Sequence, residues 1–297
     1  MKVLSNSANA VRLLYVNLFV QCAIIVTGAI VRITKSGLGC PTWPQCVGDS
    51  IVPLASQEEA WHKYVEFGNR LLTFVLVIVA ALVLISVWRT TKIRSIRILA
   101  LAPILGTILQ ALLGGVTVLT GLHPATVAAH FMVSVIIVAL SHQLVRRYKS
   151  PNKVTRTHLL GNLITLNAFV VLFLGTLVTG SGPHSGDVDA SSRFSYELEH
   201  IASIHAKAVW SFCILLAFFA YKKYNQIGRQ SRNSFILLAG VTLAQGFIGY
   251  VQFALGLPES LVLIHIVSAV IFWVATLRLR FDLIEYESVE SDSKKYH

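Results

Sequence analysis

Two histidines that end matching sequence stretches are the residues of this chain best suited to chemistry. The stretch QALLGGVTVLTGLHPATVAAH ends at His130, and the stretch AQGFIGYVQFALGLPESLVLIH ends at His265. An offset of 135 positions aligns the two histidines and also aligns Gly114 with Gly249. Imidazoles that project from two helices of one bundle commonly hold a haem iron from both faces. The repeat therefore indicates that the chain has two helix stretches that each end in a candidate haem-ligand histidine.

The composition indicates the kind of secondary structure that must position these histidines. The chain has 297 residues, of which 55% are hydrophobic and 13% charged, and its mean hydropathy is +0.67. A bilayer core about 30 Å thick needs about 20 apolar residues per helix, and a helix satisfies its own backbone groups in lipid. We therefore expect eight spanning helices, near 11–31, 69–88, 98–119, 125–145, 159–179, 203–221, 234–254 and 261–279.

The basic residues indicate the orientation of these helices. Nineteen of the 25 lysines and arginines lie on one side of the expected membrane, and the positive-inside rule makes that side cytoplasmic. Both termini are then cytoplasmic, and the long connections 32–68 and 180–202 lie outside. The formal net charge of +11 is thus a signal of topology and does not indicate nucleic acid as a partner. The nineteen residues are Lys2, Arg12, Arg89, Lys92, Arg94, Arg97, Arg146, Arg147, Lys149, Lys153, Arg156, Lys222, Lys223, Arg229, Arg232, Arg278, Arg280, Lys294 and Lys295.

The offset of 135 positions also predicts the domain organisation. Four crossings separate the two copies, so both run in the same direction, as in parallel repeats related by an axis along the membrane normal. We expect an all-α polytopic membrane protein built as two tandem four-helix bundles with pseudo-two-fold symmetry. The predicted parts are an N-terminal half over 1–150, a C-terminal half over 151–284 and a cytoplasmic polar tail over 285–297.

The depth of the histidines favours a shared site over separate packing roles. His130 and His265 are expected about one turn inside the outer ends of their helices, and His205 at the outer start of 203–221. The counterpart of His205 in the N-terminal half is Asn69. A single histidine inside a membrane often makes only an interhelical hydrogen bond, and that alternative stays open for each one.

Several stretches together resemble the haem A synthases, membrane enzymes that oxidise a methyl group of haem O to the formyl group of haem A for cytochrome oxidases. The resemblance rests on GAIVRITKSGLGCPTWPQC at 28–46, on EFGNR at 66–70 and on the three histidines. It implies that the C-terminal half holds haem b as a cofactor, with His205 and His265 on its iron. The N-terminal half is then the pocket for the substrate haem, with His130 on the substrate iron.

The same resemblance implies a catalytic group on the second helix, and one residue departs from it. The family has a Glu-x-x-His-Arg motif where this chain has Glu66, Asn69 and Arg70. An amide oxygen is a poor ligand for haem iron beside imidazole. Asn69 either marks a half that has lost a ligand or leaves an open iron face for oxidation, and we favour the second. Glu66 either pairs with Arg70 four residues later or serves the reacting methyl group through charge or proton transfer.

The four cysteines divide into two pairs by position. Cys40 and Cys46 flank PTWPQ in an outer loop, where the oxidising compartment preserves disulfides, so we expect them to be bridged, as the family's first-loop pair is. Cys22 and Cys213 lie within helices and are expected to be small core residues. The second cysteine pair of the family's relatives has no counterpart in 180–202.

The resemblance also implies partners and a location. It implies haem O as the substrate, haem O synthase and cytochrome oxidase assembly factors as partners, and lipid as the surrounding medium. It is also compatible with a homo-oligomer. No mitochondrial presequence precedes the first apolar stretch, which favours a bacterial cytoplasmic membrane. Two other classes fit parts of the pattern: a membrane b-type haem electron carrier, which the asparagine at position 69 disfavours, and a transporter, which does not explain histidines gathered at one face.

Overall fold

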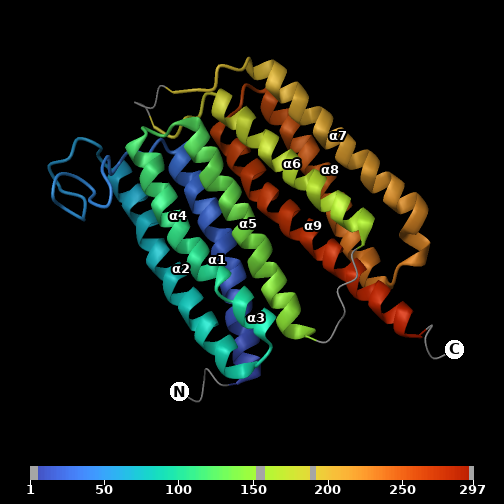
Figure 1. The fold of residues 1–297 in the computed structure, drawn as a ribbon. Helices are drawn as coiled ribbons and strands as arrows, with labels where there is room; N and C mark the ends of the chain where they lie inside the picture. Colours follow the sequence, from blue (N-terminus) through green and yellow to red (C-terminus); the bar gives the residue numbers. More distant parts are fainter. Residues whose placement is uncertain (1–5, 152–157, 188–191, 294–297) are drawn as a thin grey trace. The chain divides into compact units, whose positions relative to one another are not determined.

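The computed structural model is all-helical over the residues it describes, which are 6–151, 158–187 and 192–293, with side chains described up to 284. Within these described residues, eight helical segments are long and apolar enough to cross a membrane, which confirms the predicted all-α, eight-helix membrane fold. The helices are α1 (Ser7–Ile33), α2 (His62–Thr90), α3 (Arg94–Leu99), α4 (Ala102–Leu119), α5 (Pro124–Lys149), α6 (Leu159–Ser181), α7 (Leu198–Lys223), α8 (Arg229–Ala254) and α9 (Glu259–Ser293) (Figure 1).

The third predicted span is interrupted near its start. The stretch expected as one helix over 98–119 consists of α3 and α4, which meet at Ala100 and Leu101. Pro103 lies in the first turn of α4, where it has no N–H to donate and its ring excludes the carbonyl group of the residue four positions earlier. That residue is Leu99, the last of α3, so the proline accounts for the break.

The chain divides into two compact units, which are residues 1–149 with 179–196, and residues 150–178 with 197–297. We call them unit 1 and unit 2, and each is described by itself. The polar tail expected over 285–297 falls partly within α9, and residues 294–297 lie outside the described part. Of the basic residues used for the topology, Lys2, Lys153, Arg156, Lys294 and Lys295 also lie outside it.

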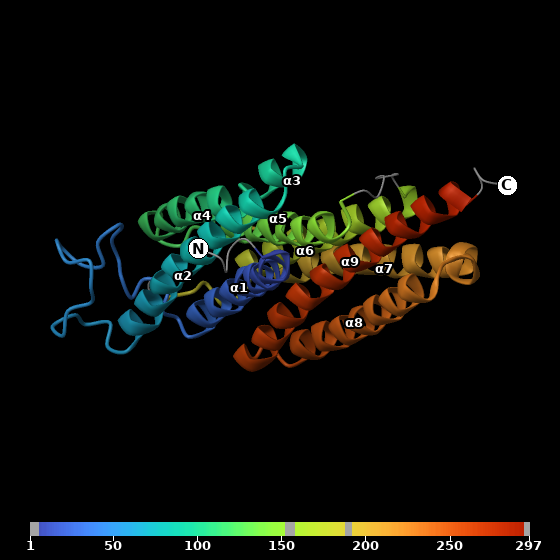
Figure 2. The ribbon, with the colours of Figure 1, turned by 90° about the horizontal axis from the view of Figure 1, so that it is seen from below.

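Unit 1 is a four-helix bundle of α1, α2, α4 and α5, with α3 at one end (Figures 1 and 2). Buried polar side chains join its helices: Asn17 donates to the hydroxyl of Ser141 at 3.1 Å, and Gln21 donates to Thr107 at 3.2 Å. Such bonds between membrane helices stabilise by about 0.6–2 kcal/mol each. The loop between α1 and α2 extends from the end opposite α3, which we call the outer end of unit 1 (Figures 1 and 2).

Unit 2 is formed by α6, α7, α8 and α9, and aromatic and charged side chains hold it together. Phe212 of α7 meets Phe272 of α9 at 5.0 Å between ring centroids. The carboxylate of Asp282, only 3% exposed, accepts hydrogen bonds from Gln230 and Ser234 of α8, each at 2.6 Å. A buried carboxylate requires such donors, so Asp282 ties the beginning of α8 to the far part of α9.

Candidate functional site

The three candidate ligand histidines share one packing arrangement, in which the imidazole lies against a glycine of the preceding helix in the same unit. A Cβ built on Gly114 of α4 would lie 3.5 Å from Cε1 of His130, and one built on Gly249 of α8 would lie 3.3 Å from Cε1 of His265. His205 of α7 packs in the same way on Gly175 of α6, at 3.4 Å. A Cβ would be in ordinary van der Waals contact with the ring at Gly114 and Gly175 and in tight contact at Gly249, so each imidazole packs directly on a glycine surface.

The histidines lie at matching depths in their helices. His130 lies six residues after the first residue of α5, and His265 lies six residues after the first residue of α9. The structure corrects the expected position of His205: α7 begins at Leu198, so His205 lies seven residues inside the helix and not at its start. Asn69 likewise lies seven residues inside α2. Six or seven residues of helix rise about 10 Å, which places all four side chains about two turns from the helix start.

The two imidazoles of unit 2 are suited to act as ligands of a haem iron. The Nδ1 atoms of His205 and His265 are buried and have no hydrogen-bond partner within the described structure. Burying an imidazole nitrogen without a partner is unfavourable, so the rings suit a bound group that engages them. No group of three or more His, Cys, Asp or Glu residues in the described part could hold a bare metal ion. Two imidazoles are sufficient when a porphyrin supplies the other iron ligands.

The Nδ1 atom of His130 in unit 1 is buried and unpartnered in the same sense, among the described residues. A glutamine holds the backbone around it: Nε2 of Gln110 donates to the His130 carbonyl at 2.9 Å and also to the hydroxyl of Ser134. Gln110 is aligned with Gln245 by the repeat, and both have a buried Oε1 without a partner in the part of the chain that is described. Gln110 is therefore a positioning residue that the sequence repeat signalled.

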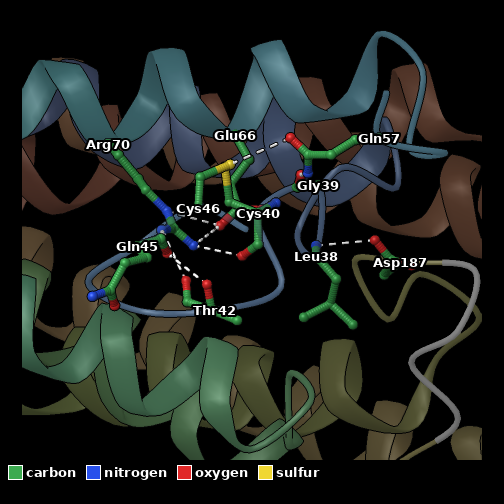
Figure 3. Close-up of polar contacts among 10 residues, drawn as sticks. All are labelled: Leu38, Gly39, Cys40, Thr42, Gln45, Cys46, Gln57, Glu66, Arg70 and Asp187. Carbon is green, nitrogen blue, oxygen red and sulfur yellow. Dashed lines mark hydrogen bonds and ion pairs between the residues drawn. A yellow bond between two sulfur atoms is a disulfide. The ribbon is translucent and has the colours of Figure 1, made fainter. Parts of the chain in front are cut away.

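Glu66 and Arg70 form an ion pair that holds the cysteine loop, residues 38–46, at the outer end of α2 (Figure 3). The Nη2 atom of Arg70 donates to Oε1 of Glu66 at 2.6 Å, and Oε2 of Glu66 accepts from the backbone N–H of Cys40 at 2.6 Å. Arg70 also donates to the carbonyl groups of Cys40, Thr42 and Gln45, at 2.6, 3.0 and 3.1 Å. The pairing expected as one alternative for Glu66 is therefore present, and both carboxylate oxygens are engaged.

The loop carries the predicted disulfide. Cys40 and Cys46 are bonded, with an S–S distance of 2.02 Å, and both residues are fully buried. Cys22 and Cys213 are free, as expected for cysteines within helices. The disulfide is confirmed, and Figure 3 draws it beside the backbone groups that Arg70 and Glu66 bind.

Trp43 packs the cysteine loop on α4, next to the glycine that faces His130, a contact that sequence reasoning missed. A Cβ on Gly115 would lie 2.5 Å from the Trp43 indole, whereas a Cβ on the preceding Gly114 would face His130. Two consecutive glycines of α4 therefore admit the indole of the loop and the imidazole of α5. The doubled glycine in QALLGGV was the available signal, but nothing in the local pattern shows which residue packs on it.

A second outer segment, residues 179–187, fastens the other side of the loop within unit 1. The N–H of Gly37 donates to the Gly186 carbonyl at 2.8 Å, and the N–H of Leu38 donates to Asp187 at 3.0 Å. Arg32 at the end of α1 donates to the carbonyl groups of Thr179 and His184 in this segment, at 3.1 and 2.8 Å. Sequence reasoning missed these contacts because they join residues about 150 positions apart.

Asn69 points its amide at α1. The hydroxyl of Thr27 donates to Oδ1 of Asn69 at 2.7 Å. The structure thus brings Glu66, Arg70, Cys40 and Cys46 into one network in unit 1, with Asn69 on the same helix. Among the described residues, no hydrogen bond or ion pair joins His130 to this network.

Comparison with known proteins identifies the family. The family model COX15-CtaA, described as cytochrome oxidase assembly protein, matches residues 11–184. This match covers more than half of the chain, which therefore belongs to the COX15-CtaA family. The matched residues include the cysteine loop, Glu66, Arg70 and His130, whereas His205 and His265 lie beyond them.

Curated relatives agree with this assignment. The chain is 32% identical over 170 residues to the heme A synthase of Lysinibacillus sphaericus, which covers 52% of this chain and 53% of the relative. It is 29% identical over 168 residues to the heme A synthase of Bacillus mycoides, covering 52% of each. It is 33% identical over 118 residues to the heme A synthase of Halalkalibacterium halodurans, covering 39% of this chain and 38% of the relative. The chain thus spans about half the length of the first two relatives, and less of the third.

The first prediction concerns the hold of Arg70 on the cysteine loop. Arg70→Lys replaces a planar fork of donors by a single ammonium group, which cannot reach Glu66 and three carbonyl groups together. Losing one or two charge-assisted hydrogen bonds costs about 1.5–3 kcal/mol, so we expect reduction of the Cys40–Cys46 disulfide to become at least about tenfold faster. The measurement is the time course of thiol labelling after a water-soluble reductant is added.

The matched control is Arg97→Lys, because Arg97 also donates to backbone carbonyl groups, those of Thr91 and Trp88, each at 2.7 Å. It lies beside the opposite end of α2, so its replacement should leave the reduction rate unchanged. A Cys40→Ser, Cys46→Ser double variant gives the background labelling of Cys22 and Cys213. Equal reduction rates in the wild type and in Arg70→Lys would show that Arg70 does not hold the loop closed.

Proposed function

We propose that this member of the COX15-CtaA family is a haem A synthase that oxidises a methyl group of haem O to the formyl group of haem A, for use by cytochrome oxidases. The observation that carries the proposal is the outer-end site of unit 1. There the buried imidazole of His130 and the network of Glu66, Arg70 and the cysteine loop lie within the segment that matches the family. The heme A synthases among the relatives support the same activity.

In this proposal unit 1 binds the substrate haem, and its side chains have separate roles. His130 holds the substrate iron from α5, where Gly114 and Gln110 set the place of its ring and backbone. Glu66 is the carboxylate available to accept a proton or to stabilise positive charge that develops near the reacting carbon. Arg70 positions that carboxylate through two bonds to Oε1, at 2.6 and 3.0 Å.

Unit 2 is proposed to hold the resident haem b, with His205 and His265 as its axial ligands. The support is their matched packing on Gly175 and Gly249 and their unpartnered buried nitrogens. When bound, haem b supplies one-electron transfer. With His205 and His265 both holding its iron, this haem would be suited to electron transfer rather than to oxidation of a substrate.

The proposed location is a bacterial cytoplasmic membrane with both termini inside. The basic residues at the inner helix ends support this orientation, and it places the Cys40–Cys46 disulfide in an oxidising compartment. Haem O synthase and cytochrome oxidase assembly factors are the proposed partners, and a homo-oligomer is compatible with the site. The asparagine in place of a histidine at position 69 argues against a carrier with two bis-histidine haems.

The second prediction tests the haem b ligands. Either His205→Ala or His265→Ala removes one of two axial imidazoles, so we expect the low-spin haem spectrum of the purified protein to be lost. The matched control is His200→Ala, which changes an exposed histidine of the same helix and should leave the spectrum as in the wild type. An unaltered low-spin spectrum in both site variants would exclude these ligands.

The third prediction tests the catalytic unit. In cells that also express a haem O synthase, Glu66→Gln and His130→Ala should each lower haem A yield, by about 100-fold for Glu66→Gln if it moves the proton. Both variants should keep the haem b spectrum, because unit 2 is unchanged. The measurement is chromatography of extracted haems together with optical spectroscopy of the purified protein.

Glu66 also holds the cysteine loop, so disulfide labelling accompanies each yield measurement. A Glu66→Gln protein with an intact disulfide, a normal haem b spectrum and little haem A supports a chemical role for the carboxylate. A normal haem A yield from both variants would mean that unit 1 is not the active site, and the roles of the two units would have to be exchanged.

A further inference from the structure

Unit 1 departs from unit 2 at one place in an otherwise repeated arrangement. His130, His205 and His265 each lie against a glycine of the preceding helix. The fourth place of this kind lies between α1 and α2. There Asn69 occupies the depth that His205 has in its own unit, and GAIV at 28–31 of α1 corresponds to GTLV at 175–178 of α6. A Cβ on Gly28 would have no heavy atom within 4 Å beyond the neighbouring backbone of its own helix.

A hydrogen bond holds Asn69 in this place. The Thr27 hydroxyl, adjacent to Gly28, donates to Oδ1 of Asn69 at 2.7 Å. The oxygen of the amide is therefore engaged, and its Nδ2 makes no hydrogen bond within the described structure. An amide nitrogen has two protons to donate and no lone pair to offer a metal. Asn69 is thus suited to donate to a ligand and unsuited to bind iron itself.

The two sides of unit 1 that flank this place are unlike. His130 projects from α5 and packs on α4, whereas Asn69 projects from α2 and is bonded to α1. A haem held by the His130 imidazole therefore has a second axial position without a protein ligand from Asn69. By the repeat, Asn69 takes the place in unit 1 that His205 has in unit 2, so a small ligand at that position would meet its amide.

Resting on the proposed function, we propose that unit 1 takes a small diatomic ligand at the iron of its haem substrate, opposite His130, and that Nδ2 of Asn69 donates a hydrogen bond to it. Thr27 is the positioning residue that orients the amide. Unit 2, with imidazoles on both sides, takes no such ligand. The two units therefore differ in what their haems bind, although the sequence repeats the same helices.

Carbon monoxide is the probe, since it binds ferrous haem only at a free axial position and its stretching frequency reports a nearby donor. The experiment uses the full chain, purified with haem b and haem O bound and then reduced. We expect carbon monoxide to bind the haem O fraction and leave haem b unchanged. Asn69→His should suppress binding by supplying a second imidazole, and His130→Ala should lower the amount of haem O retained.

Two variants test the donor itself. Asn69→Leu removes the amide, so the C–O stretch should move to higher frequency, and carbon monoxide should dissociate about 2- to 10-fold faster, as expected for the loss of one hydrogen bond. Thr27→Val frees the amide and should shift the stretch in the same direction by less. The matched control is Thr117→Val, because the hydroxyl of Thr117 bonds only to the Leu113 carbonyl of its own helix, and it should change nothing.

The outcomes separate this inference from the function on which it rests. Haem O that is retained through His130 but is low-spin and does not bind carbon monoxide overturns the inference and leaves the proposed function standing. An unchanged stretch in both Asn69→Leu and Thr27→Val overturns the role of Asn69 as donor. Haem O retention that is unaffected by His130→Ala counts against the proposed function itself. The haem b spectrum of each variant confirms that the protein is folded.

Discussion

The ion pair of Glu66 and Arg70 is the interaction on which the outer end of unit 1 depends. Arg70 uses its guanidinium to bind the carboxylate and three carbonyl groups of the cysteine loop, and Glu66 accepts the N–H of Cys40 in return. Glu66 is only 5% exposed, and removing one partner of a buried pair costs about 3–5 kcal/mol. The loop has little regular structure, but its polar backbone groups have charged side-chain partners in place of water. These partners fix its position.

The position of the loop determines what surrounds the histidine of unit 1. Because Arg70 holds Cys40, Thr42 and Gln45, the indole of Trp43 between them is directed onto Gly115. The neighbouring Gly114 accommodates His130. The cysteine loop and the imidazole of His130 therefore pack on adjacent glycines of the same helix, α4.

The paired glycines and histidines explain how one helix arrangement can serve two purposes. Small residues let the imidazoles approach the neighbouring helix closely, and the same arrangement occurs at His205 and His265 in unit 2 and at His130 in unit 1. Asn69 interrupts it at a single position. Under the proposed function, this one exchange would leave the iron in unit 1 with an open side, whereas two imidazoles would hold the iron in unit 2.

The sequence by itself determined the spanning helices, the repeat, the three histidines and the cysteine pair. Hydropathy and spacing are local properties, and lipid requires helices wherever an apolar stretch is long enough. Helix ends were less well predicted: α7 begins at Leu198 and α2 at His62, because a helix continues into polar residues that an apolar pattern does not include. Only the tertiary structure decided that Glu66 and Arg70 bind the cysteine loop, that Trp43 packs on Gly115, and that Thr27 holds Asn69. These contacts join residues between 25 and 72 positions apart, and which side chains meet across such distances is set by the packing of whole helices, a property that no local pattern contains.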